Sequence, residues 1–220
     1  MSKAIYSASH ISDMEQRFRA EFINSLSGFK SANLVGTQSR DGQQNLAIVS
    51  SVVHIGANPP LLGMIMRPHT VQRDTLENIK NTGVYTLNNV TPTMTQAAHQ
   101  TSARYDQDVS EFAAVGLTPE PSTAVVAPYV AESTIRMSLE VQDIQFIPIN
   151  RTELVIGQIV EVILPEDSID KTGYIDIEHC DSICISGLVS YHGTERVARY
   201  SYAKPDKELI NLYEREGEAQ

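Results

Sequence analysis

The sequence predicts a mainly β protein, a barrel or sandwich with flanking helices. After Gly28, strand-like runs separated by turn signals fill most of the chain. Along Ile135–Gln142, apolar residues at the odd positions alternate with polar ones, as in an antiparallel strand with one face in water. Helix-like segments are few and scattered, so the regular strand–helix alternation of a doubly wound sheet is absent.

The first helix is expected over Ser12–Leu26. Ser12 and Glu15 have the spacing of a capping box, and apolar residues recur at helical intervals up to Leu26. Gly28 then suits the left-handed cap that ends many helices. Residues 1–29 are therefore expected to form a helix that packs on the flank of the barrel.

The strands and shorter helices follow in order, with turns such as Asp41-Gly42 between them. The expected strands are Ser31–Ser39, Gln44–Val53, Leu61–Met66, Val84–Asn88, Ile135–Gln142, Glu153–Leu164 and Ser182–Ser190. The expected helices start near Asp74-Thr75, run from Pro92 towards Tyr105, and span Lys207–Arg215. Without a repeat or linker, residues 30–205 read as one barrel domain and 206–220 as an acidic C-terminal helix or tail.

Charge and composition exclude several classes of protein. The 220 residues carry 17 Lys and Arg against 27 Asp and Glu, a formal charge of −10, which argues against general binding of nucleic acid or anionic lipid. Two cysteines cannot form a disulfide framework. The N-terminal segment lacks a signal-peptide core, and no apolar run reaches the ~20 residues of a membrane helix. We expect a soluble, cytoplasmic protein.

Common catalytic and nucleotide-binding motifs are also absent. The chain has no G-x-G-x-x-G, no P-loop and no G-x-S-x-G nucleophile elbow. His179, Cys180 and Cys184 form the only metal-like cluster, but three ligands at that spacing fall short of a structural zinc site. No metal site is predicted, and no catalytic side chain can be assigned.

An anion site is indicated around the start of the helix near Asp74. Arginines and threonines precede or open that helix, whose first N–H groups point outward and favour negative charge. Arginine adds charge-assisted bonds to phosphate oxygens, while Asp74 most simply caps the helix. A solvated loop with paired arginines is the competing interpretation. The candidate phosphate ligands are Arg67, Thr70, Arg73 and Thr75.

A second candidate lies in the strand after Asp41-Gly42. Small and hydroxylated residues at its centre would let a flat ligand approach the backbone, whose N–H and C=O groups can contact the polar edge of a heterocycle. The competing interpretation is an ordinary strand with its serines facing water. The candidate residues are Asn45, Leu46, Ala47, Ser50 and Ser51.

Taken together and in this order, these motifs resemble the flavin reductase-like family, whose fold is the FMN-binding split barrel. The resemblance runs from about Ser31 to Glu161. It is carried by Asp41-Gly42…Asn45-Leu46-Ala47…Ser50-Ser51, Asn58-Pro59-Pro60, Arg73-Asp74-Thr75…Asn78-Ile79, Thr82-Gly83-Val84-Tyr85…Asn88 and Gly116-Leu117-Thr118…Pro128…Glu132-Ser133.

The resemblance implies a six-stranded antiparallel split barrel that binds FMN, with FAD as an alternative, and that commonly forms a homodimer. By the same resemblance, the residues of the second stretch would contact the isoalloxazine ring and ribityl chain, and those of the first would hold the phosphate. Arg199, Tyr200 and Tyr202, in a late segment rich in tyrosine and cations, are further candidates for cofactor binding. A dimer-interface or packing loop would explain that segment equally well.

The function implied is transfer of hydride from NAD(P)H to flavin. The Gly-Asp-His segment of NADH-dependent flavin reductases is missing, and the matching region is Ile149–Gly157. This absence favours an alternative, a flavin-binding carrier or sensor protein without reductase activity. A flavoprotein that acts on an organic substrate is a further alternative.

Overall fold

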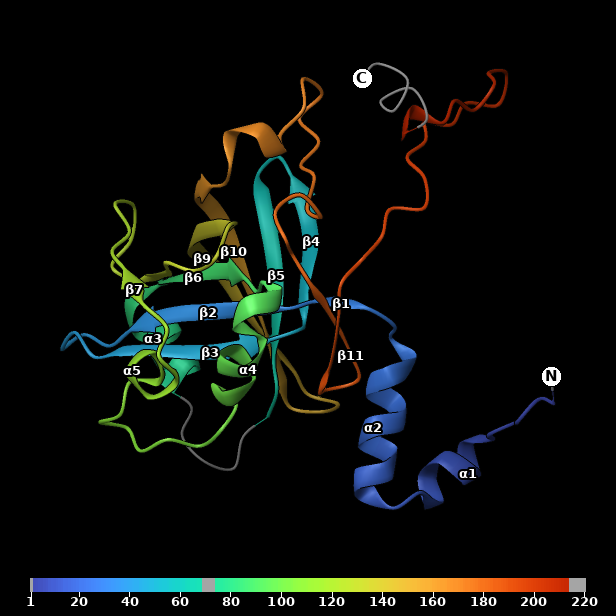
Figure 1. Cartoon of the computed structure of the whole chain (residues 1–220). Helices are drawn as coiled ribbons and strands as arrows, with labels where there is room; N and C mark the ends of the chain where they lie inside the picture. The colour runs from blue at the N-terminus through green and yellow to red at the C-terminus, as the bar shows by residue number, and fades with distance from the viewer. Residues whose placement is uncertain (1, 69–73, 214–220) are drawn as a thin grey trace.

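The fold was analysed in a computed structural model, which describes residues 2–68 and 74–213 of the chain (Figure 1). Its framework is a seven-stranded antiparallel sheet with the strand order β3-β2-β6-β9-β10-β5-β4. The sheet curls, so that β4 and β5 run steeply across the direction of β2 and β3 (Figure 1). The strands of this sheet are β2 Asn33–Gln38, β3 Gln44–Val49, β4 Val52–Ala57, β5 Pro60–Met66, β6 Val84–Asn89, β9 Arg136–Ile147 and β10 Thr152–Ile163.

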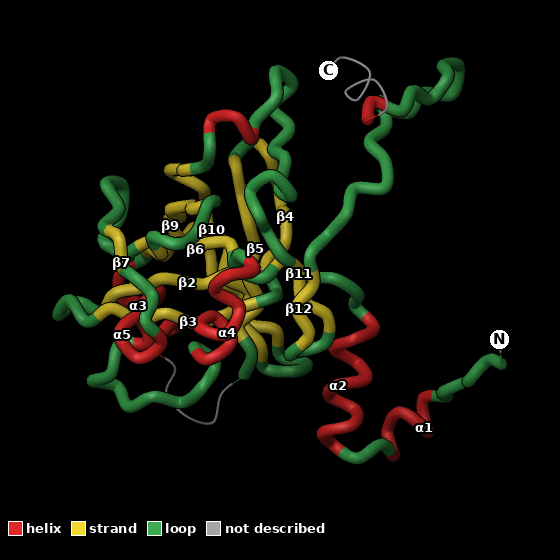
Figure 2. Tube along the Cα trace, in the orientation of Figure 1, coloured by secondary structure: helices red, strands yellow, loops and turns green. Residues whose placement is uncertain are grey.

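Short pairs of strands and scattered helices complete the fold (Figure 2). The small sheets join β1 Lys30–Ser31, β11 Cys184–Ser186 and β12 Ser190–His192, and separately β7 Pro119–Glu120 and β8 Tyr129–Val130. The helices are α1 Ala8–Asp13, α2 Gln16–Leu26, α3 Asp74–Thr82, α4 Thr95–Gln100 and α5 Glu111–Val115, with 3₁₀ turns at Pro92–Met94 and Glu166–Ser168. The predicted mainly β architecture is confirmed, although the main sheet has seven strands and not six.

The core has two layers because β2 is buried on both faces. Leu34 packs in one cluster with residues of β3, α4 and α5, whereas its neighbour Val35 packs in a second cluster with α3 and the strands β5, β6, β9 and β10. Successive side chains of a strand point to opposite faces, so one strand serves both clusters. The first cluster packs the edge strand β3 against the short helices α4 and α5.

The expected first helix is divided into two. Ser7 caps α1, and the Glu15 side chain accepts hydrogen bonds from the N–H groups of Arg17 and Phe18 and so caps α2. Glu15 therefore begins a new helix instead of completing a capping box with Ser12. Neither helix has a buried residue, and both stand to one side of the sheet (Figure 1). The helix α2 contacts the barrel through Asn24, whose Oδ1 accepts from Arg67 at 2.9 Å.

Several predicted strand and helix limits are wrong. The run Gln44–Val53 is not one strand, because it bends at Ser50-Ser51 between β3 and β4. The run Ser182–Ser190 is also not one strand, because it contains β11 and the turn that leads into β12. The helix that starts at Pro92 ends at Gln100, well before Tyr105. The helix α5 was not predicted; its five residues are too few to show a helical period.

The C-terminal segment is an extended arm, defined here as residues 193–213, that runs away from the barrel (Figure 1). The expected helix Lys207–Arg215 is absent over residues 207–210, and its last two residues lie outside the described part of the chain. Instead, the Ser201 N–H donates to the carbonyl of Ile210, and Tyr200 forms a β-bridge with Asn211. An isolated short helix is marginal in water, and this arm has no core against which to stabilise one.

Two further findings concern membranes and metals. None of the helices in residues 2–68 and 74–213 has the length and hydropathy of a membrane span. His179 pairs with Asp167 at 3.1 Å, whereas Cys180 and Cys184 are buried free thiols. In the same part of the chain, no group of three or more metal-ligating side chains lies close together.

Candidate functional site

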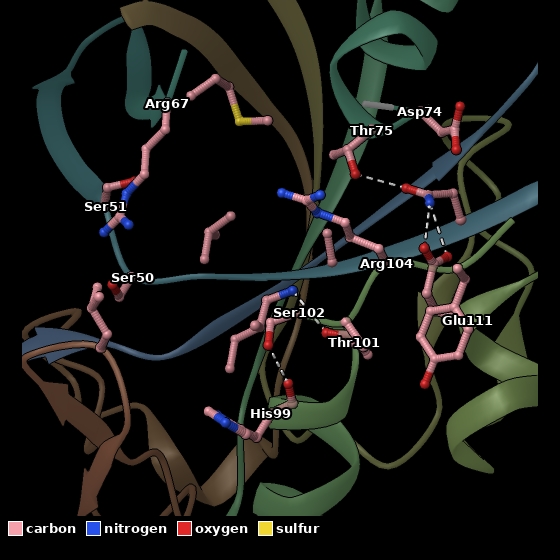
Figure 3. A pocket seen from close by; sticks show the side chains of 18 of the residues that line it. Ser50, Ser51, Arg67, Asp74, Thr75, His99, Thr101, Ser102, Arg104 and Glu111 are labelled. Carbon is pink, nitrogen blue, oxygen red and sulfur yellow. Dashed lines mark hydrogen bonds between the residues drawn. The ribbon is translucent and has the colours of Figure 1, made fainter. Parts of the chain in front are cut away.

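A cavity of about 930 Å³ lies along the edge strand β3 (Figure 3). Its walls come from β3 and the Ser50-Ser51 bend, the end of β5, the start of α3, the end of α4 with the loop after it, and β12. This volume is at the upper end of the range of ~300–1,000 Å³ typical of small-molecule sites. The cavity brings together segments that are far apart in the sequence.

Half of the predicted binding residues line this cavity: Asn45, Ala47, Ser50, Ser51, Arg67 and Thr75. Thr70 and Arg73 lie outside the described residues. Leu46 does not face the cavity, since its side chain is fully buried in the core cluster with Phe112. Strand alternation explains this difference, because neighbours of Leu46 on the strand point to the opposite face.

The bend after β3 offers open polar groups. The Ser51 hydroxyl donates to the carbonyl of Ile65 at 2.8 Å, and the Ile65 N–H donates back to the Ser51 carbonyl, so Ser51 fastens the bend to β5. Ser50, which is half-buried, makes no hydrogen bond to any described residue. The backbone N–H and the hydroxyl of Ser50 are therefore available for a ligand in a cavity that Ala47 also lines.

The rest of the outer edge of β3 is already hydrogen-bonded. The Leu46 N–H donates to the carboxylate of Glu111 at 3.0 Å, and the Ile48 N–H donates to the Thr101 hydroxyl at 2.9 Å. An exposed sheet edge would otherwise leave these groups unpaired. Side chains of α5 and of the segment after α4 thus cover the edge up to Ile48, and the open backbone begins at Ser50.

Asn45 is a positioning residue within a buried polar network. Its Nδ2 donates to both carboxylate oxygens of Glu111, at 3.0 and 2.8 Å, and its Oδ1 accepts from the Thr75 hydroxyl at 2.7 Å and from Thr37 at 3.3 Å. The Asn45 side chain is therefore fully engaged within the protein. Because the Thr75 hydroxyl donates its proton to Asn45, Thr75 can offer a phosphate only its backbone N–H as a donor.

Two arginines line opposite parts of the cavity. Arg67 lies beside Ser51 and donates to Asn24 Oδ1 of α2 at 2.9 Å, whereas Arg104 extends into the space between Thr75 and Ser102 (Figure 3). Arg67 and Thr75, predicted as parts of one phosphate site, thus appear on different sides of the view. Arg104 was not predicted from the sequence.

Glu111, His99 and Tyr191 are three further cavity residues that the sequence did not reveal. Burial raises the pKa of the Glu111 carboxyl above its ordinary value of 4.5, against the opposite effect of the hydrogen bonds from Leu46 and Asn45. His99 Nδ1 lies 2.9 Å from the Tyr191 hydroxyl, and burial raises the pKa of that hydroxyl. The partners of each pair are distant in sequence, so no local motif could have signalled them.

The predicted residues of the late segment lie elsewhere. Arg199 donates to Asp170 at 2.7 Å and stacks 4.0 Å from the ring centre of Tyr174. Tyr200 and Tyr202 are 58% and 87% exposed on the arm. None of the three predicted residues lines the cavity of its own chain.

The cavity residues fit a flat heterocycle that carries an anionic group. Ala47 leaves room for a ring against the strand, and Ser50 offers donors to ring heteroatoms. Arg67 supplies positive charge in a protein with a net charge of −10. An open edge with fixed donors and a nearby cation is suited to binding a cofactor such as a flavin and to stabilising negative charge on it.

Comparison with known proteins also indicates a split barrel related to flavin chemistry. A split-barrel protein of the flavin reductase type from Shewanella frigidimarina NCIMB 400 superimposes with a TM-score of 0.88; it is 52% identical, over 91% of this chain and 100% of that one. Nitrilotriacetate monooxygenase component B from Bacillus cereus has the same fold, with a TM-score of 0.78 and 22% identity over 89% and 98% of the two chains. An uncharacterized protein of Halalkalibacterium halodurans is 30% identical over 66% of this chain and 71% of its own.

The flavin reductase like domain matches residues 27–182, which contain the whole curled sheet and the cavity walls other than those from β11, β12 and the turn between them. This match covers well over half of the chain and agrees with the split barrel of the solved structures. The chain belongs to the flavin reductase-like domain family.

Proposed function

We propose that the protein binds FMN in the cavity along β3 and acts as an oxidoreductase in which hydride passes from NAD(P)H to flavin. The observation that carries the proposal is the shared cavity itself, where the open bend at Ser50 and the cation of Arg67 accompany the small side chain of Ala47. FAD is an alternative ligand, because the cavity is large for a single mononucleotide.

The residues of this chain have positioning and electrostatic roles in the proposal. Ala47 would lie against the ring, and the Ser50 N–H and hydroxyl would donate to its polar edge. Arg67, with Thr70 and Arg73 by the family resemblance, would hold the phosphate. The flavin, when bound, supplies the ability to accept and release hydride, so the protein needs no nucleophile of its own.

The proposal is tested by adding FMN and then NADH or NADPH to the purified protein. Binding is measured by quenching of flavin fluorescence, and turnover by loss of the near-ultraviolet absorbance of the reduced nicotinamide. We expect saturable flavin binding and flavin-dependent oxidation. Absence of oxidation above the flavin-free control would reject the reductase assignment.

A second candidate function is flavin carriage or sensing without reductase activity. It is favoured by the missing Gly-Asp-His segment, since Ile149–Gly157 instead forms the exposed turn between β9 and β10 and the start of β10. Tight retention of FMN with no nicotinamide oxidation would select this candidate. A flavoprotein with an organic substrate would instead oxidise NAD(P)H only when that substrate is present.

We further propose a cytoplasmic homodimer. The proposal is supported by α2 and the C-terminal arm, which expose apolar side chains to solvent: Phe18, Leu26 and Val197 are 57%, 68% and 93% exposed. A second copy would cover such surfaces. Sedimentation velocity on the full chain tests the proposal, and a monomer at micromolar concentration would contradict it.

A further inference from the structure

The cavity has a second wall that the flavin assignment does not use. One wall is β3 with the Ser50-Ser51 bend and Arg67. The other wall carries His99 at the end of α4 and Ser102 and Arg104 on the following loop (Figure 3). Tyr191 of β12, which is hydrogen-bonded to His99, also lines the cavity. These side chains come from segments outside the motifs that carry the family resemblance.

Arg104 on this second wall has no acidic partner among the residues that the structure describes. It makes no ion pair or hydrogen bond with any residue in 2–68 or 74–213. In contrast, Arg136 and Lys80 each pair with a carboxylate, at 2.7 and 2.9 Å. The chain has 27 acidic residues for 17 Lys and Arg, so carboxylate partners are in excess. An arginine in such an acidic protein that lacks a carboxylate partner and points into a cavity is suited to an anionic ligand.

The other residues of this wall are polar and hydrogen-bonded to one another. His99 Nδ1 and the Tyr191 hydroxyl are hydrogen-bonded at 2.9 Å with their rings edge to face, and the Ser102 hydroxyl donates to the His99 carbonyl at 2.7 Å. The wall is therefore pre-formed around a hydrogen-bonding pair, which reduces the ordering that a ligand would have to impose. It offers a second molecule both aromatic surface and polar contacts.

From these observations we infer that the wall of His99, Ser102, Arg104 and Tyr191 binds the second substrate, and that this substrate is a planar molecule with an anionic group held by Arg104. The anion is a phosphate of a nicotinamide dinucleotide or the carboxylate of an aromatic acceptor. This inference rests on the proposed function, because a second substrate requires that a flavin already occupies the same cavity. The flavin phosphate belongs to the other arginine, Arg67.

The experiment uses matched pairs of ligands on the FMN-loaded full chain. Equilibrium dialysis measures the dissociation constants of AMP, the adenylate half of NAD⁺, against adenosine, which lacks the phosphate, and of benzoate against benzamide, which lacks the charge. The variants are Arg104→Ala, Arg104→Lys, and Lys171→Ala as a control that removes one exposed cation from a distant loop.

We expect Arg104→Ala to weaken binding of at least one anionic ligand by about 10-fold or more, with less than about 2-fold change for its uncharged partner. Arg104→Lys should recover part of this loss, and Lys171→Ala should have no effect. Loss for AMP alone identifies a nucleotide phosphate, as in a dinucleotide, and loss for benzoate alone identifies an aromatic acid.

Three outcomes overturn the inference: no binding of either anion to the wild type, equal losses for charged and uncharged ligands, or weaker FMN but unchanged riboflavin binding in Arg104→Ala. The last outcome would place Arg104 on the flavin phosphate. The titrations are repeated without flavin. If neither flavin binds but the anion selectivity persists, the anion site stands and the proposed function fails.

Discussion

Glu111 holds the side chain of Asn45 with both of its carboxylate oxygens, at 3.0 and 2.8 Å from Asn45 Nδ2. The same carboxylate accepts the Leu46 N–H, so one residue of α5 fixes two consecutive residues of the edge strand β3. Asn45 in turn accepts from Thr75, the second residue of α3. One buried network thus joins the strand β3, which would carry the ring, to the start of α3.

Replacement of Glu111 should therefore cost stability. In Glu111→Gln, one carboxylate oxygen becomes an NH₂ group that faces the donors of Asn45 and Leu46, so at least one buried donor loses its partner. We expect a loss of ~1–3 kcal/mol in the free energy of unfolding, measured by urea denaturation. Glu132→Gln is the matched control, because Glu132 also accepts a backbone N–H with both oxygens but is exposed. Equal losses in the two variants would show that burial of the network contributes nothing.

The pH dependence of stability should carry the signature of Glu111. Burial raises the pKa of this carboxyl in the folded protein, so the folded state binds the proton more tightly than the unfolded state. The contribution of Glu111 is then fully present below the ordinary pKa of 4.5 and is lost as the pH rises through the folded pKa. We expect the advantage of the wild type over Glu111→Gln to be larger at about pH 4.5 than at about pH 7.5. Urea titrations at both values test this, and an advantage that grows with pH would contradict it.

The sequence predicted those parts of the fold that local patterns determine. Alternation along Ile135–Gln142 and the apolar run Glu153–Leu164 correctly indicated strands at β9 and β10. The expected wet face of β9 is wrong at Ser138, which is fully buried and hydrogen-bonded to Tyr129. The same local rules failed at Ser50-Ser51. There the bend between β3 and β4 is held by hydrogen bonds from Ser51 to Ile65, a residue fourteen positions away, and nothing in the serines themselves requires it.

The candidate site shows the same division. Ala47, Ser50 and Arg67 could be identified from local patterns. Small residues on a strand indicate room for a flat ligand, and a cation before a helix in an acidic protein indicates an anion site. Glu111 and Arg104 could not, since α5 has only five residues and Arg104 stands in a loop. Their importance depends on tertiary contacts across β3, which no spacing in the sequence encodes.

Arg67 provides a direct test of the phosphate assignment. Arg67→Ala should weaken FMN binding by ~1.5–3 kcal/mol, the scale of a charged hydrogen bond, and should leave riboflavin binding nearly unchanged because riboflavin has no phosphate. Fluorescence titration with both flavins measures the difference. Arg40→Ala is the control, since Arg40 donates to the Asn81 carbonyl outside the main cavity. Equal losses for FMN and riboflavin would remove Arg67 from the phosphate site.

Gly157 and Tyr85 form a close contact inside the barrel. Gly157 lies at an irregularity in the pairing of β10 with β9, and a Cβ atom there would overlap the hydroxyl of the fully buried Tyr85. The Tyr85 hydroxyl makes no hydrogen bond to the described residues, so it contributes contact and not polar pairing. We expect Gly157→Ala to lower the free energy of unfolding by ~1–3 kcal/mol through overpacking.

Tyr85→Phe removes only the hydroxyl and so separates overpacking from backbone effects. Alone, it should change stability by less than ~1 kcal/mol, because a buried hydroxyl without a partner contributes little or is unfavourable. Combined with Gly157→Ala, it should recover part of the loss, since the ring carbons nearest the new Cβ, at 2.9 and 3.0 Å, remain crowded. Urea unfolding of the four proteins gives the coupling energy, which we expect to be ~0.5–2 kcal/mol. A coupling energy of zero would mean that Gly157 is required for the backbone irregularity and not for the space that Tyr85 fills.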